Sequence, residues 1–301
     1  MLRPGGASHV QPGEARDVSP ITVVDQRATE AHPRRPGVHA QRPDRGRHGQ
    51  CGRRRPGPAR LEVSEIDGPP LKVTHIDGTL SVGYDDLSRK GFRKWLGHYT
   101  RTAHVTLTVP VGTSATVGVV GGSAVVSGLS GHAELRGVSG DFTLLGLTGP
   151  VQADTVSGRV EAQAVTGALR FHSVSGDLTV IEGSGPSVRA ESVSGDMVLD
   201  LAPAPTCSDI CLTTVSGEIA IRLPHPTDAK VEANTASGSV SNGFADLRVT
   251  GQWGAKRITG RLGTGHGSLK ATTVSGAISL LRRPPSEDDT DTTDGTQGKV
   301  L

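Results

Sequence analysis

The tripeptide Val-Ser-Gly recurs along the chain and constrains its fold more than any other feature. It ends at the glycines of positions 140, 158, 176, 195, 217 and 276, and weaker copies such as Leu129-Ser130-Gly131 lie between the strong ones. Glycine is therefore found every nine residues from position 122 to position 185. Self-similarity at a fixed short period predicts a solenoid, in which each coil packs only on its neighbours.

Apolar residues alternate with other residues after each of these glycines. A period of two predicts a half-buried strand. The first inward position of each copy predicts one continuous column in the core: Phe142, Val160, Leu178, Met197, Ile219, Val240, Leu262 and Ile278. The expected fold class is all-β, a parallel β-helix (β-solenoid) with about 18–22 residues per coil.

The glycines themselves are expected at the corners between strands. A sharp change of chain direction often needs positive φ, which a Cβ atom makes costly. The expectation includes two looser copies of the repeat, Ala236-Ser237-Gly238 and Ile258-Thr259-Gly260. The expected corners are Gly140, Gly158, Gly176, Gly195, Gly217, Gly238, Gly260 and Gly276.

The beginning of the repeat domain, residues 58–108, lacks the glycine spacing. Short alternating runs predict N-terminal strands there, and Asp67-Gly68 and Asp77-Gly78 predict hairpin turns. Four aromatic residues around a basic stretch predict a cap over the open end of the solenoid, and a surface for membrane headgroups or a partner is the alternative. They are Tyr84, Phe92, Trp95 and Tyr99. The segment around the other tryptophan, Trp253, is expected to be a loop that packs over the core.

Composition separates both chain ends from the repeat domain of residues 58–283. Residues 1–57 are rich in Arg, Pro and Gly and contain neither lysine nor Phe, Tyr or Trp. This pattern predicts a disordered segment and is typical of a GC-rich coding region translated in the wrong frame; a basic arm and an ordinary linker are the alternatives. Residues 284–301 are expected to form an acidic disordered tail, and no nucleic-acid partner is expected.

The sequence contains few features that would indicate a cofactor or a targeting segment. The three cysteines, Cys51, Cys207 and Cys211, fit neither a zinc framework nor a disulfide scaffold, and we expect no metal and no cofactor. No apolar run approaches the length of a membrane span, and the start lacks the sections of a secretory signal. The default expectation is a cytoplasmic protein, with an envelope location if the true N-terminus is missing.

Charged residues directly follow several corner glycines and would stack on one outer ladder: Asp141, Arg159, Asp177, Asp196 and Glu218. Carboxylates about 5 Å apart could act as an acid/base pair in sugar chemistry or bind calcium. Against this, Arg159 interrupts the row, and an aspartate after a turn glycine is ordinary turn chemistry. We therefore expect these residues, together with Trp95, to form an interaction surface, and we expect no catalytic residue.

The serial Ser-Val-Ser-Gly-Asp and Thr-Val-Ser-Gly copies carry a family resemblance. They run from Ser173 to Asp177, from Ser192 to Asp196 and from Thr214 to Glu218, and Asn234-Thr235-Ala236-Ser237-Gly238 extends the series. From about Ala59 to Arg283 the chain resembles the bacterial β-strand-repeat family of unknown function whose members are labelled adhesins. The resemblance implies a β-helical fold and brings no established activity or catalytic residues.

These observations predict a non-enzymatic interaction or scaffold protein, adhesin-like, with a protein or glycan partner. Two alternatives stay open. One is a polysaccharide-acting β-helix enzyme that uses the acidic ladder. The other is a cytoplasmic polymer former that stacks solenoid ends, as bactofilin-like β-helices do.

Overall fold

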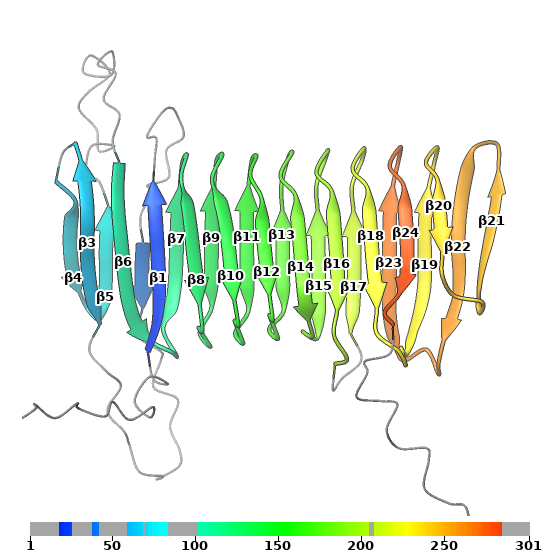
Figure 1. The fold of residues 1–301 in the computed structure, drawn as a ribbon, viewed down its shortest axis with the longest axis horizontal. Coiled ribbons are helices and arrows are strands. Elements are labelled where there is room, and N and C mark those ends of the chain that lie inside the picture. The colour runs from blue at the N-terminus through cyan, green and yellow to red at the C-terminus, as the bar shows by residue number, and fades with distance from the viewer. Residues whose placement is uncertain are drawn as a thin grey trace, which may run out of the picture. The chain divides into compact units, whose positions relative to one another are not determined.

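The computed structural model describes residues 18–25, 38–41, 59–68, 70–83, 102–204 and 208–284. The expected aromatic cap with Trp95, the cysteines Cys51 and Cys207, and residues 285–301 of the acidic tail lie outside the described residues. The chain divides into two compact units, Met1–Ala153 and Asp154–Leu301. In each unit the described residues are all-β and form two sheets, rich in parallel strand pairs, as expected for a β-solenoid (Figure 1).

The first unit begins with antiparallel strands and continues with parallel ones. Its strands are β1 (Val18–Asp25), β2 (Val38–Gln41), β3 (Arg60–Asp67), β4 (Lys72–Ile76), β5 (Thr79–Gly83), β6 (Thr102–Pro110), β7 (Ser114–Val119), β8 (Ser123–Ser127), β9 (Ala133–Gly137), β10 (Asp141–Leu145) and β11 (Val151–Thr155), the last of which crosses the unit boundary. One sheet has the order β10-β8-β1-β6-β3, and the other has the order β11-β9-β7-β2-β5-β4.

Two strands of the first unit come from the N-terminal segment that was expected to be disordered. β1 lies between β6 and β8 and is antiparallel to both, and β2 lies in the same way between β5 and β7. Ile21 is fully buried. The expectation of disorder over residues 1–57 does not hold for these two stretches, because backbone pairing with a neighbour on each side can hold a short strand.

Only one of the two expected hairpins forms. Asp77 and Gly78 both have positive φ and join β4 to β5, which pair antiparallel from Ile76↔Thr79. The prediction of a hairpin at Asp67-Gly68 is wrong, because β3 and β4 belong to different sheets and do not pair. Gly68, with a φ of 116°, instead lies in the connection that changes sheets.

The second unit holds the most regular repeats. Its strands are β12 (Val160–Gln163), β13 (Leu169–His172), β14 (Leu178–Gly183), β15 (Ser187–Glu191), β16 (Met197–Leu201), β17 (Asp209–Thr213), β18 (Ile219–Leu223), β19 (Ala229–Thr235), β20 (Val240–Asn242), β21 (Leu247–Gln252), β22 (Ala255–Leu262), β23 (Gly267–Thr273) and β24 (Ile278–Arg282). Within this unit the even-numbered strands β12 to β20, with β24, form one sheet, and β13 to β23 (odd numbers), with β22, form the other.

After β18 the order of the strands in the sheets no longer follows their order in the chain. The last strand, β24, lies between β18 and β20, and β23 lies between β17 and β19. The strands β19 and β20 are thereby moved one place outward, and the antiparallel hairpin of β22 and β21 completes its sheet (Figure 1). The C-terminal coil is therefore inserted between two coils that precede it in the chain.

The expected core column forms, with one error. In the second unit Val160, Leu178, Met197 and Ile219 pair in succession, and Ile278 follows before Val240. Phe142 is equally buried in the first unit. Leu262 does not belong to the column, because it lies on the antiparallel strand β22 opposite Ala229.

The corner glycines stack, but positive φ is not the general reason for them. Of the eight expected corners only Gly158 has positive φ. At Gly195 a Cβ atom would overlap the carbonyl oxygen of Gly176 in the preceding coil, and at Gly276 it would overlap that of Gly217. Glycine is required because the backbones of successive coils approach closely. Gly260 is not a corner, since it lies inside β22.

Candidate functional site

A repeated set of hydrogen bonds builds each corner in the second unit. In the coil of Gly195, the buried Ser192 hydroxyl accepts a hydrogen bond from the Gly195 N–H at 3.0 Å. The exposed Ser194 hydroxyl donates to the carbonyl oxygen of Val174 in the preceding coil at 3.4 Å. Equivalent bonds recur in the coils of Gly217, Gly276 and Gly238. The two hydroxyls of the motif thus lock each corner and join it to the next.

The valine of the motif accepts these bonds only through its backbone carbonyl, and its side chain points outward. One half-exposed valine per coil results, with 45–52% of the residue exposed, in a row that we call the corner ridge. Backbone bonds such as Val193 N–H to Val174 O, at 3.2 Å, set one valine after another. The corner ridge consists of Val156, Val174, Val193, Val215 and Val274.

The expected acidic ladder runs beside the ridge. Oδ1 of Asp177 accepts the backbone N–H of Asp196 at 3.0 Å, and Oδ1 of Asp196 accepts that of Glu218 at 2.7 Å. Arg159 lies at the equivalent position one coil earlier, because Val160 and Leu178 pair. Asp141 begins β10 in the first unit, and Trp95 is outside the described residues.

The ladder can offer negative charge at regular intervals. Neighbouring strands lie about 4.8 Å apart, which is close to the carboxyl separation of about 5 Å in retaining glycosidases. However, the carboxylates of Asp177 and Asp196 already accept hydrogen bonds from backbone N–H groups. The ladder also lies on an outer corner, where Asp196 is exposed. Acid/base catalysis usually takes place in a cleft that excludes water, so this geometry suits recognition better than catalysis.

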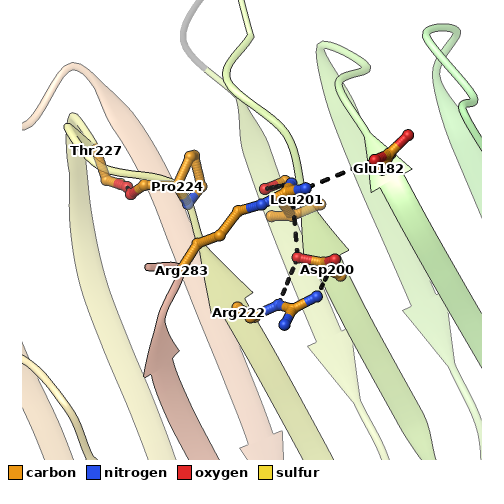
Figure 2. A network of polar contacts seen from close by, with 7 residues as sticks. All are labelled: Glu182, Asp200, Leu201, Arg222, Pro224, Thr227 and Arg283. Carbon is orange, nitrogen blue, oxygen red and sulfur yellow. Dashed lines mark hydrogen bonds and ion pairs between the residues drawn. The ribbon is translucent and has the colours of Figure 1, made fainter. Parts of the chain in front are cut away.

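A buried carboxylate that sequence reasoning did not single out anchors a second polar network (Figure 2). Asp200 accepts two hydrogen bonds from the guanidinium of Arg222, one of them 2.8 Å long between Nε and Oδ1. Arg283, just after β24, approaches the same carboxylate at 3.8 Å, donates to Leu201 O at 3.3 Å and lies 3.6 Å from Glu182. This network ties the inserted coil to β16 and to the end of β14.

This arrangement shifts the pKa values of Asp200 and Arg222. The Arg222 hydrogen bond, helped by the charge of Arg283, holds the pKa of Asp200 below its usual value although burial opposes this. The pKa of Arg222 is raised by the same hydrogen bond. A permanently charged pair of this kind joins the C-terminal ends of β16 and β18 and has no proton to give near neutral pH.

Two histidine clusters lie elsewhere in the second unit. His172 Nδ1 is 3.2 Å from Asp154, and its Nε2 is 4.0 Å from Glu191. Asp228 accepts hydrogen bonds from Thr264 Oγ1 at 2.6 Å and from His266, which hold its pKa well below the usual range. Both clusters are partly exposed, and among the described residues no group of three or more His, Cys, Asp or Glu side chains could hold a metal ion.

The segment around Trp253 differs from the expectation. It was expected to pack over the core, but Trp253 is 98% exposed. Trp253 and Gly254 form the two-residue turn between β21 and β22, and both have positive φ. The turn of an antiparallel hairpin, rather than a loop of a wide coil, therefore carries the tryptophan.

The fold and the corner motif define an all-β repeat protein. The family model described as Toastrack DUF4097 matches residues 72–281, and the chain belongs to this family. Neither the curated proteins nor the solved structures contain a match to the chain. Within the part of the chain that the structure describes, no helix is long and apolar enough to cross a membrane.

Proposed function

We propose that the chain is a non-enzymatic parallel β-helix of about 18–22 residues per coil that acts as an adhesin-like interaction or scaffold protein. The proposal of the coil size is supported by the register, in which Leu178, Met197 and Ile219 are partners 19 and 22 residues apart. Membership of the Toastrack family supports a repeated β fold.

The observation that carries the proposal is the corner ridge. The hydroxyls and the glycine of each motif make the contacts that hold the corner, and the valine side chain remains half-exposed. Because the valine side chain makes none of these hydrogen bonds, the bonds of the corner do not require an apolar residue at this position. A continuous row of exposed apolar side chains is instead typical of an interaction surface.

The ligand class follows from what borders the ridge. The acidic ladder lies on one side, so the surface combines aliphatic groups with regularly spaced negative charge. An extended protein segment with apolar and basic side chains complements both properties. We therefore place a protein partner first and a glycan second.

The test compares two surface variants with the unaltered protein. Val174→Ser with Val193→Ser removes ridge side chains. Arg170→Ser with Arg189→Ser changes two exposed residues of β13 and β15, the strands that precede the same corners. Crosslinking in native cells, followed by mass spectrometry, identifies the partner. We expect the ridge variant to lose the partner crosslinks and the arginine variant to keep them; equal crosslinking by all three proteins contradicts the proposal.

A polysaccharide-acting enzyme is the second candidate, favoured by the spacing of the carboxylates in the acidic ladder. The variant Asp177→Asn with Asp196→Asn separates the two functions. If the chain is an enzyme, reducing ends released from a panel of acidic and neutral polysaccharides appear with the unaltered protein and vanish with the variant. If it is an interaction protein, neither releases any.

A further inference from the structure

The tip of the β21–β22 hairpin displays an aromatic side chain that the fold does not use. Trp253 is the most exposed large apolar residue of the described chain, at 98%. Its φ of 55° is a conformation that bulky residues rarely adopt. At the comparable turn of the first unit, the positive φ before glycine is taken by Asp77, a residue type suited to it.

The hairpin is also uniformly basic. Between Leu247 and Leu262 it contains Arg248, Lys256, Arg257 and Arg261 and no acidic residue. Glu232 of β19 neutralises Arg257 at 2.6 Å. Among the described residues the other three cations form no ion pair, and all three are exposed. Lys256 lies nearest to the tip, opposite Gly251.

Position in the sheet adds to these properties. Among the described strands β21 is the last of its sheet, so within this part of the chain the hairpin has a neighbouring strand on one side only. Val249 on this edge strand is 50% exposed. Basic residues on an edge strand discourage pairing with another strand, but this accounts for Arg248 and not for a tryptophan at the turn.

We propose that this hairpin docks on an anionic lipid bilayer, with Trp253 among the headgroups and the cations of the hairpin facing lipid phosphates. An indole ring combines an apolar body with a polar N–H group and favours the bilayer interface. Basic side chains near an anionic leaflet add attraction that falls off within a Debye length. A projecting turn also fits a soft surface better than a rigid ligand, for which converging polar groups in a concavity are usual.

The tryptophan content makes the proposal directly testable. The chain has two tryptophans, so the full-length variant Trp95→Phe reports on Trp253 alone. We expect its emission to shift to shorter wavelength on phosphatidylcholine vesicles that contain phosphatidylglycerol, and to be quenched when the acyl chains carry bromine. Phosphatidylcholine alone, or high salt, should give little change. Unchanged emission on the anionic vesicles overturns the proposal.

Matched charge reversals locate the contact. Arg248→Glu with Lys256→Glu should weaken vesicle binding about fivefold or more for each changed residue. Arg170→Glu with Arg189→Glu makes the same change of charge on β13 and β15, away from the hairpin, and should leave the Trp253 quenching intact. Equal losses in both variants, with unchanged far-ultraviolet circular dichroism, overturn the proposal because net charge would then explain the binding. A spectral shift caused only by a soluble acidic polysaccharide also overturns it, in favour of a glycan site.

Discussion

Two regions of the second unit use the same corner chemistry in different chain orders. From β12 to β18 each coil stacks on the one made just before it. From β19 to β24 the coil made last lies between two earlier coils, and a hairpin of opposite direction closes the sheet. The hydrogen bonds at the corners are the same in both regions. Ser216 and Ser275 both donate at 3.4 Å to the valine carbonyl of the neighbouring coil, across 23 and 60 residues of chain respectively.

The comparison shows that the repeat specifies stacking and leaves order to other features. The hydroxyls and the glycine make the same bonds to the neighbouring coil whether that coil is near or distant in the chain. Order then depends on connection lengths and on contacts outside the motif, such as the bonds from Arg283 to the preceding coils. Variants that affect order and variants that affect stacking should therefore behave differently.

The largest effect is expected from removal of the inserted coil. A chain that ends at His266 lacks β23 and β24, including the fully buried Leu269, Ile278 and Leu280. At about 2–3 kcal/mol for each of these side chains, the loss is comparable to the whole stability of a domain. Hydrogen exchange read by mass spectrometry should show lost protection in β19–β22 and retained protection in β12–β16.

A chain that ends at Pro284 is the control and should exchange as the full-length protein does. Retained protection throughout the shorter chain would mean that β19 and β20 close onto β17 and β18 directly. The inserted position of the last coil would then be unnecessary for stability.

A valine at the corner should be costly in both regions. Gly195→Val and Gly276→Val each direct a side chain into a neighbouring carbonyl group and should lower the free energy of unfolding by about 1–3 kcal/mol. Urea denaturation measures the change, and Val193→Ala, at a half-exposed position, is the control. A much smaller loss at Gly276 than at Gly195 would show that the inserted coil packs loosely.

The Asp200 network should make the inserted coil sensitive to pH. Because the folded-state pKa of Asp200 is lowered, its contribution to stability is present above the unfolded pKa of about 3.9 and is lost as the pH falls through the folded value. Asp200→Asn should therefore melt several degrees below the unaltered protein near pH 7. The gap between the two should narrow below about pH 4.

Asp246→Asn, at an exposed position before β21, is the comparison for this experiment. Its effects on the melting temperature and on the pH dependence of that temperature should be much smaller than those of Asp200→Asn. A constant gap between Asp200→Asn and the unaltered protein from pH 7 down to pH 3 would separate the effect from the charge of Asp200.

The smallest effect on stability is expected at the corner ridge. Val174→Ser with Val193→Ser changes two half-exposed side chains, and each should alter the free energy of unfolding by no more than about 0.5 kcal/mol. Thermal melting checks this. A loss of several kcal/mol would show that the ridge is part of the packing and would remove the main support for an interaction surface there.

The fold of the regular coils could be predicted because their determinants are local. Alternation of apolar residues placed Leu178, Met197 and Ile219 in one column, and the structure pairs them. The same pattern says nothing about strand direction, so Leu262 and Gly260 were assigned to a parallel coil and lie on an antiparallel strand. The insertion of β23 and β24, and of β1 and β2, depends on partners distant in the chain and leaves no periodic signal.

The candidate site also has a part that local sequence predicts and a part that it does not. The contacts of Asp177, Asp196 and Glu218 follow from register, and in the structure the backbone N–H of each later residue donates to the carboxylate of the one before it. The network of Asp200, Arg222 and Arg283 could not be foreseen, because its members are brought together by the order of the coils. One available signal was overlooked. Gly254 after Trp253, between runs that read as strands, is typical of a two-residue hairpin turn.

The place of β23 and β24 also determines when the sheets of the second unit can close during synthesis. Among the described strands the ribosome makes these two last, yet they fill a slot between strands made earlier. Until they arrive, β17 and β18 on one side and β19 and β20 on the other have open edges, which attract chaperones, proteases or other chains. The second unit can therefore close only after β24 has been made, and a product terminated before β23 leaves the gap between these strands open.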